Sequence, residues 1–165
     1  MTDGRGKKAG REMANCWLFL SDPETYHYDE VFKKEREVWD GVWGAAAQRY
    51  LAGIKKGDRI IGYHTAPEKS ACCELEAVSE AYQNPEEREK NLVVEVRGVK
   101  KFKRPVPLGE MRKNPKLKGM KLFKFFRPIA ISPLTAAEFK RHKQVVRLTI
   151  VVLVRGRRNS RKGRR

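Results

Sequence analysis

The stretch VWDGVWG, residues 38–44, carries side chains that are well suited to hold a flat, ring-shaped ligand. Trp39 and Trp43 lie four residues apart, and glycines at 41 and 44 flank the second ring. A tryptophan ring stacks on planar ligands, and glycine lets the backbone approach a ligand closely. Large apolar side chains also fill protein cores, so this stretch predicts either a core contact or the wall of a pocket.

A nucleobase is one flat ligand of this kind, and its recognition has known requirements. Reading a base turned out of its stack needs an aromatic surface and a few hydrogen bonds to the edge of the base. Stacking on an aromatic side chain stabilises binding by about 1–3 kcal/mol per base. All three tryptophans of the chain fall between positions 17 and 43. Polar side chains that can donate or accept hydrogen bonds occur at Ser21, Asp40, His64 and Thr65.

Each of these residues also has an ordinary structural interpretation. Trp17 lies inside an apolar run and fits the core equally well. Ser21 precedes an Asp-Pro pair and can stabilise a turn, while a single histidine such as His64 is more often structural. The sequence leaves both interpretations open for these three side chains.

The charge of the chain points to a polyanionic partner. Its 165 residues carry 37 Lys and Arg against 20 Asp and Glu, a net charge of +17. Residues 97–127 hold twelve of these cations against Glu110, so one folded segment is strongly basic. Lysines and arginines there are expected to contact phosphates, although a solvated basic face is the alternative. The candidates are Lys103, Arg104, Lys113, Lys116, Lys118, Lys121, Lys124 and Arg127.

Other classes of function find little support in the sequence. Cys16, Cys72 and Cys73 lack the spacing of a zinc site, so we expect reduced thiols and no metal. Neither a catalytic motif nor a cofactor motif is present, and we expect a binding protein rather than an enzyme. The apolar run 148–154 is too short to span a membrane. We therefore expect a monomer that binds DNA or RNA, in the cytoplasm with the nucleoid or in a nucleus.

The elements that must position these side chains belong to an α+β domain. Residues 1–13 and 155–165 are polar and basic, and we expect them to be flexible extensions around a domain at 14–154. A Thr135–Glu138 capping box predicts a helix start, and Gly98 a bulge. The expected helices lie at 29–38, 45–53, 105–115 and after 135, and the expected strands at 15–20, 59–64, 72–82, 91–102 and 127–131. Residues 145–154 are rich in β-branched side chains and favour a last strand, with a buried continuation of the preceding helix as the alternative.

Seven phrases in order give the chain a resemblance to a known family. They are CWLFLSDP, VWDGV, KKGDRIIGYHT, EAVSEAY, PVPLGEM, NPKLKGMKLF and SPLTAAEF. Together they resemble the EVE domain, a family of the PUA-like superfamily related to the ASCH and YTH groups. The resemblance covers residues 15–142. It implies a PUA-like curved antiparallel β-barrel flanked by short helices, with a cleft that reads a modified base through an aromatic cage.

The same resemblance assigns residues to that cleft, and within it we expect Ser21, Asp40, His64 and Thr65 to contact the edge of the base. The positions that match the family pattern are Trp17, Ser21, Asp22, Pro23, Trp39, Gly41, Val42, Tyr63 and His64, with Thr65 keeping a hydroxyl where the family has serine. Three positions depart from it. Leu20 replaces a lysine, and Trp43 with Gly44 replaces an Arg-Asn pair, so an extra ring stands where relatives have polar groups.

Three functions follow as hypotheses. The first is a non-catalytic reader of a modified base, most plausibly a modified cytosine or methyladenine, held beside Trp39 and Tyr63. The second is a PUA-like module that binds structured RNA through its charge and is insensitive to base modification. The third is a small hydrolase acting on nucleotides, by distant kinship with ASCH proteins. Affinity for modified and plain oligonucleotides at two salt concentrations separates the first two.

Overall fold

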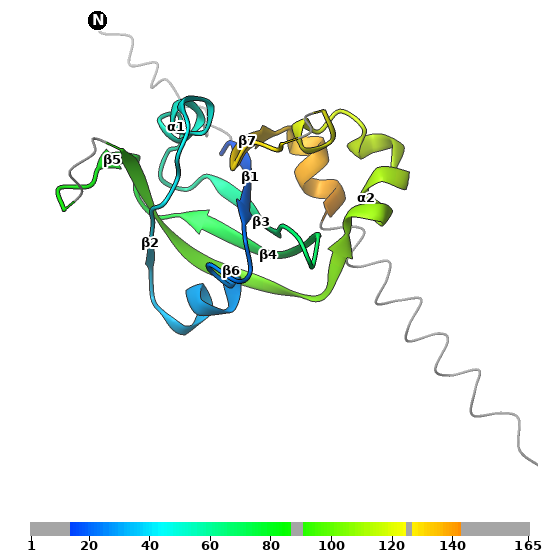
Figure 1. The fold of residues 1–165 in the computed structure, drawn as a ribbon, viewed down its shortest axis with the longest axis horizontal. Coiled ribbons are helices and arrows are strands. Elements are labelled where there is room, and N and C mark those ends of the chain that lie inside the picture. The colour runs from blue at the N-terminus through cyan, green and yellow to red at the C-terminus, as the bar shows by residue number, and fades with distance from the viewer. Residues whose placement is uncertain (1–13, 87–90, 125–126, 143–165) are drawn as a thin grey trace, which may run out of the picture.

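A strongly curved β-sheet forms the body of the protein (Figure 1). The computed structural model describes residues 14–86, 91–124 and 127–142. Within these residues seven strands follow the order β2-β6-β4-β3-β1-β7, with β5 paired to β6. They are β1 (Cys16–Ser21), β2 (Glu37–Trp39), β3 (Arg59–His64), β4 (Ser70–Ala77), β5 (Tyr82–Gln83), β6 (Leu92–Pro107) and β7 (Ile131–Leu134).

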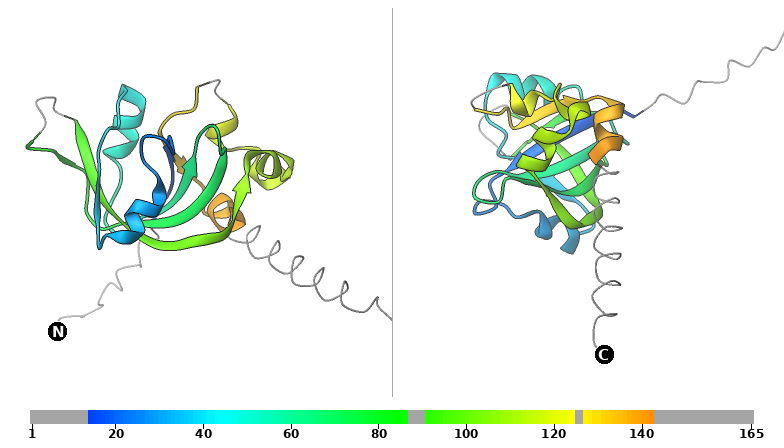
Figure 2. Two further views of the ribbon diagram at one scale, coloured as in Figure 1. Left: turned by 60° about the horizontal axis from the view of Figure 1, so that its bottom comes forward. Right: turned by 90° about the vertical axis from the view of Figure 1, so that its right-hand side faces the viewer.

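Short helices cover the ends of this sheet. Figure 2 shows that the sheet curls into a half-barrel, and in Figure 1 the helices α1 and α2 lie toward opposite ends of it. Residues 136–142 are also helical. The remaining helical segments are α1 (Ala45–Leu51), α2 (Leu108–Lys113) and the 3-10 turns η1 (Tyr28–Lys33), η2 (Pro115–Leu117) and η3 (Lys121–Phe123). The predicted α+β class with a curved sheet and short helices is confirmed.

Strand β1 lies between two hydrophobic cores because its side chains alternate between the faces of the sheet. Trp17 and Phe19 pack into one core with Tyr28 and Trp39, whereas Leu18 packs into the other. All three β1 side chains are buried, as expected for a strand covered on both faces. Its pairing with β3 is parallel, although the other pairs of the sheet in the described residues are antiparallel.

Local signals predicted several elements correctly. The capping box is present: the Thr135 amide donates to Glu138 Oε2 at 2.9 Å, and the Glu138 amide donates to Thr135 Oγ1 at 3.1 Å. The bulge at Gly98 is present too, because Leu75 pairs with Gly98 while Glu74 pairs with Lys100. A Cβ at Gly98 would lie 2.6 Å from the Phe32 ring, so glycine also allows η1 to pack on β6.

Two predicted elements were wrong in type or position. The helix expected over 29–38 is the short turn η1 followed by strand β2, because Glu37 to Trp39 pair with Val94 to Val96 of the long strand β6. Long-range pairing thus overrides local helix signals there. The strand expected at 127–131 begins at Ile131 and continues through Pro133 on an edge of the sheet, where a missing N–H is tolerated. The strand predicted at 145–154 lies outside the described residues.

Candidate nucleic-acid interface

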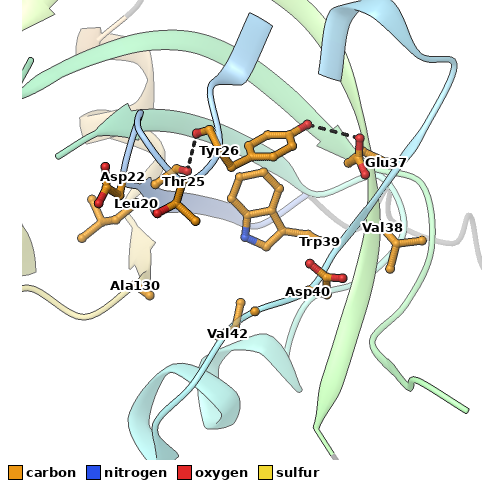
Figure 3. Close-up of a pocket in the computed structure, with 12 residues that line it drawn as sticks. Leu20, Asp22, Thr25, Tyr26, Glu37, Val38, Trp39, Asp40, Val42 and Ala130 are labelled. Carbon is orange, nitrogen blue, oxygen red and sulfur yellow. Dashed lines mark hydrogen bonds between the residues drawn. The ribbon is translucent and has the colours of Figure 1, made fainter. Parts of the chain in front are cut away.

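A pocket of about 390 Å³ opens where β1 ends, beside β2 and the chain that follows it. Its size falls within the range of small-ligand sites. Figure 3 shows the side chains around this opening, with Trp39 at the centre. The residues that line it are Leu20, Ser21, Asp22, Thr25, Tyr26, Glu37, Val38, Trp39, Asp40, Gly41, Val42 and Ala130.

Trp39 forms a rigid wall of this pocket. It is 8% exposed, and Tyr28 stacks on it with ring centroids 5.4 Å apart and planes inclined by 5°. Tyr26 meets it edge-on at 5.3 Å. In Figure 3 the indole nitrogen faces the open side of the pocket. Trp39 is therefore both a core residue and a pocket wall, so the core interpretation and the pocket interpretation of the sequence both apply to this side chain.

Tyr26 is held over Trp39 by two hydrogen bonds at opposite ends of the residue. Its hydroxyl donates to Glu37 Oε2 at 3.2 Å, and its backbone carbonyl accepts from Ser21 Oγ at 2.7 Å (Figure 3). Burial, together with the neighbouring Glu37 carboxylate, raises the pKa of Tyr26 well above its ordinary value. The ring thus stays protonated and fixed, and the Ser21 hydroxyl is used for the turn.

The structure brings six of the predicted cleft residues to one pocket. They are Ser21, Asp22, Trp39, Asp40, Gly41 and Val42. Gly41 has a φ of +67°, a conformation that favours glycine, so the chain can turn there beside the opening. Sequence reasoning missed six lining residues: Leu20, Thr25, Tyr26, Glu37, Val38 and Ala130. The aromatic run Tyr26–Tyr28 was the available signal, but it stood in a segment expected to start a helix.

Trp17 does not line the pocket. It is buried beneath the sheet, and its Nε1 donates to Asp58 Oδ2 at 2.9 Å. Asp58 also accepts from the backbone amides of Asn15 at 3.1 Å and Lys55 at 3.0 Å. The indole is part of this buried network and is a structural residue. Its assignment to the cleft is corrected accordingly.

Tyr63 and His64 also lie away from the pocket. Tyr63 packs in the second core, on the far face of the sheet from Trp39. His64 is buried, and its Nε2 accepts the Tyr28 amide proton at 3.1 Å. Thr65, at the next position, bonds through its amide to the Ser21 carbonyl at 2.9 Å. His64 and Thr65 thus connect the end of β3 to Tyr28 and Ser21, and none of the three predicted residues lines the pocket.

His64 belongs to a cluster with His27 and Glu68 whose ligand atoms lie within 4.8 Å of one another. His64 Nε2 and His27 Nδ1 accept protons from the amides of Tyr28 and Asp29, at 3.1 Å and 3.2 Å. The opposite ring nitrogens therefore carry hydrogens, and both face Glu68, at 2.6 Å and 3.6 Å. Since metal binding needs a free lone pair on the imidazole, we assign no metal ion to this cluster.

Trp43 stands outside the pocket and is 61% exposed. It follows the lining residue Val42 and precedes Gly44, whose φ is +99°. Neither a ring contact nor a cation contact to Trp43 occurs among the described residues. The ring is therefore an exposed neighbour of the opening rather than a wall of the cage.

The predicted phosphate contacts are distributed over several elements. Lys113 and Lys116 line a shallow hollow with Arg141 at the end of α2. Lys124 and Arg127 are exposed on the segment that leads to Ala130 at the pocket. Arg104 pairs with Glu110 at 2.6 Å, and Lys121 contacts the Tyr50 hydroxyl, so these two cations are partly engaged within the protein. Lys103 and Lys118 are exposed.

Comparison with known proteins places the chain in a family. A family model described as the EVE domain matches residues 15–143. Thymocyte nuclear protein 1 of mouse and of human are each 28% identical over 81% of this chain and 74% of the relative. No helix among the described residues is long and apolar enough to cross a membrane.

Solved structures superpose on most of the chain. An NMR structure of a protein from Rhodopseudomonas palustris is 30% identical, with a TM-score of 0.75, over 82% of this chain and 94% of that one. A crystal structure of human THYN1 in complex with DNA containing 5-methylcytosine is 27% identical, with a TM-score of 0.67. It covers 82% of this chain and 97% of the human one.

Proposed function

This chain belongs to the EVE domain family, and from that premise we propose that it binds nucleic acid and holds a modified nucleobase in the pocket beside Trp39. The observation that carries the proposal is the fixed indole wall, stacked by Tyr28 and crossed by Tyr26, at the mouth of a pocket of about 390 Å³. The human relative bound to DNA containing 5-methylcytosine supports the same class of ligand.

The pocket geometry suits a base that has left its stack. Trp39 and Tyr26 supply an aromatic wall and a crossing ring, while Val42 and Ala130 add apolar contact that a methyl substituent can occupy. The indole N–H of Trp39 and the hydroxyl of Thr25 are donors at the opening. Because the backbone and rings are fixed by hydrogen bonds, little order has to be created on binding.

Phosphates would be contacted outside the pocket. Lys124 and Arg127 are exposed and precede the lining residue Ala130 in the chain, so we expect them to contact phosphates next to the opening. Such contacts orient a strand and make its affinity fall with salt, without distinguishing one base from another. This division assigns selectivity to the pocket and general affinity to the basic segment.

We propose that the protein is a reader rather than an enzyme and that it acts where its DNA or RNA lies, in the cytoplasm or the nucleus. To test this function, the affinity of the full chain is measured for DNA and RNA oligonucleotides with a central 5-methylcytosine or cytosine, at two salt concentrations. A higher affinity for the methylated base that persists at both salt concentrations supports the proposal. Equal affinity across a panel of modified bases, with a steep dependence on salt, favours an RNA or DNA module that binds through charge alone.

A further inference from the structure

The charge of the pocket is opposite to that of the chain. Among its twelve lining residues three are carboxylates, Asp22, Glu37 and Asp40, and none is Lys, Arg or His, whereas the chain as a whole carries a net charge of +17. A pocket for phosphate would show the reverse arrangement, because phosphates bind cations and backbone amides. The acidic lining indicates a ligand group that donates hydrogen bonds.

Two of the three carboxylates are engaged within the protein. Glu37 Oε2 accepts from the Tyr26 hydroxyl at 3.2 Å and pairs with Lys34 Nζ at 2.6 Å. Asp22 Oδ1 accepts from the Glu24 amide at 2.9 Å and so stabilises the turn after β1. Their positions are therefore set by the fold.

Asp40 differs from these two. It follows Trp39 directly and is exposed, and within the part of the chain that the structure describes no hydrogen bond or ion pair engages its carboxylate. Figure 3 shows this carboxylate turned toward the space beside the Trp39 ring. It is an acceptor at the pocket, next to the surface on which we propose that a base rests.

We propose that Asp40 accepts a hydrogen bond from the exocyclic amino group of the bound base, so that the pocket selects cytosine-type and adenine-type bases over thymine and uracil. The inference rests on the proposed function and adds the chemical class of base. An ionised carboxylate can only accept, and the amino group of cytosine or adenine can only donate. A thymine carbonyl in that position would place two acceptors together and leave both without a partner.

The pair 5-methylcytosine and thymine isolates this amino group. Both are pyrimidines with the same methyl group, and their edges differ in an amino group against a carbonyl, with the matching change at the neighbouring ring nitrogen. The pair 5-methylcytosine and cytosine isolates the methyl group instead. One set of three oligonucleotides therefore tests base class and modification separately.

The experiment measures the affinity of the full chain for duplexes with 5-methylcytosine, cytosine or thymine opposite an abasic site. The abasic partner removes differences in base pairing. We expect the wild-type chain to bind 5-methylcytosine about tenfold more tightly than thymine, within the range for one well-formed edge contact. Asp40→Asn should bring this ratio close to one, because an amide can donate to the thymine carbonyl.

Glu24→Gln is the matched control. Glu24 is an exposed acid in the neighbouring turn that does not line the pocket, so this change removes the same charge without altering the pocket. It should keep the wild-type ratio. A wild-type chain that binds 5-methylcytosine and thymine equally, or an Asp40→Asn variant that keeps the wild-type preference, overturns the inference.

The two proposals fail in different ways. If 5-methylcytosine and cytosine bind equally but both exceed thymine, the amino-group inference stands and the reading of the methyl group is wrong. If 5-methylcytosine binds more tightly than cytosine but thymine binds as tightly as 5-methylcytosine, the proposed reading of a modified base is supported and the proposed role of Asp40 is wrong. If all three bases bind equally, both proposals are overturned.

Discussion

The rings of Tyr28 and Trp39 stack almost in parallel, with centroids 5.4 Å apart and planes inclined by 5°. Tyr28 is fully buried, and its hydroxyl donates to the Phe19 carbonyl at 2.8 Å. The backbone of β1 therefore fixes Tyr28, and Tyr28 in turn fixes one face of Trp39. A ligand in the pocket meets a ring that is already held in place.

The first prediction concerns Trp39 itself. Trp39→Phe keeps a ring against Tyr28 but removes the indole N–H and part of the wall. We expect Trp39→Phe to lower the free energy of unfolding by about 1–3 kcal/mol. Trp39→Ala should lower it further, by about 3–5 kcal/mol. Trp39→Phe should also weaken the preference for 5-methylcytosine over cytosine. Urea denaturation and oligonucleotide titration measure the two effects.

Trp17→Phe is the matched control for that variant. Trp17 is also a buried tryptophan, and its Nε1 donates to Asp58 rather than facing the pocket. The change should lower stability to a similar degree and leave the preference for the methylated base unchanged. If both variants lose the preference equally, the loss reflects general destabilisation, and Trp39 has no special part in binding.

The second prediction separates Trp43 from the fold. With 61% of its surface exposed and no ring partner in the described residues, Trp43→Ala should change the free energy of unfolding by less than about 0.5 kcal/mol. We expect the ring to stack on a base next to the one in the pocket. Affinity for nucleic acid should then fall by about 1–3 kcal/mol, whatever the modification.

Tyr82→Ala provides the comparison for Trp43. Tyr82 is 37% exposed on β5 and does not line the pocket, so its removal should leave nucleic-acid affinity unchanged. Fluorescence anisotropy on labelled oligonucleotides measures both variants. Equal affinities of Trp43→Ala and the wild-type chain would show that the exposed indole takes no part in binding.

The third prediction ranks the basic residues. Lys124→Gln with Arg127→Gln removes two cations from the segment that leads to Ala130 at the pocket. Lys113→Gln with Lys116→Gln removes two from the hollow at the end of α2. Each phosphate contact contributes a slope of about −0.9 to the dependence of log affinity on log salt for duplex DNA. The first pair should reduce the slope more. If the second pair of substitutions reduces this slope more than the first, the phosphates are contacted at the end of α2.

The fourth prediction concerns stability at alkaline pH. Burial raises the pKa of Tyr63 from its usual value of 10.0 to about 12, with Arg112 opposing part of this shift. Between these values the folded chain keeps a proton that the unfolded chain has lost, so the free energy of unfolding falls as pH rises. Below pH 10 Tyr63 is protonated in both the folded and the unfolded chain, so its full contribution to stability is present. The slope for a single group approaches about 1.4 kcal/mol per pH unit.

Tyr63→Phe removes this contribution, because phenylalanine does not titrate. Urea denaturation of both chains across the alkaline range should therefore show a shallower loss of stability for the variant. The difference between the two chains isolates Tyr63 from Tyr28, whose pKa is also raised by burial. Parallel curves for the two chains would contradict the prediction.

Much of the fold follows from local patterns in the sequence. The apolar run of β1, the pairing of β3 with β4 and the capping box at Thr135 each depend on residues close together in the chain. The stretch around Trp39 likewise identified the pocket wall, because Trp39, Asp40, Gly41 and Val42 are neighbours in sequence and in space. Short-range chemistry is sufficient for such features.

The rest of the site depends on distant contacts. Ala130 reaches the pocket because its carbonyl accepts the Leu20 amide at 2.8 Å, a contact between residues more than one hundred positions apart. Glu37 and Tyr26 meet there because β2 pairs with β6 instead of continuing a helix. Such pairing is decided by burial over the whole sheet, and no local pattern reports it.

The three tryptophans separate what the sequence determines from what only the tertiary structure determines. Sequence alone established the family resemblance, the basic character and the presence of stacking rings near residues 17–43. The tertiary structure decided that Trp17 bonds to Asp58 in the interior, that Trp39 forms the pocket wall, and that Trp43 faces solvent. An indole ring has the same chemistry at each position, and only the packing around it determines which surface is left for a ligand.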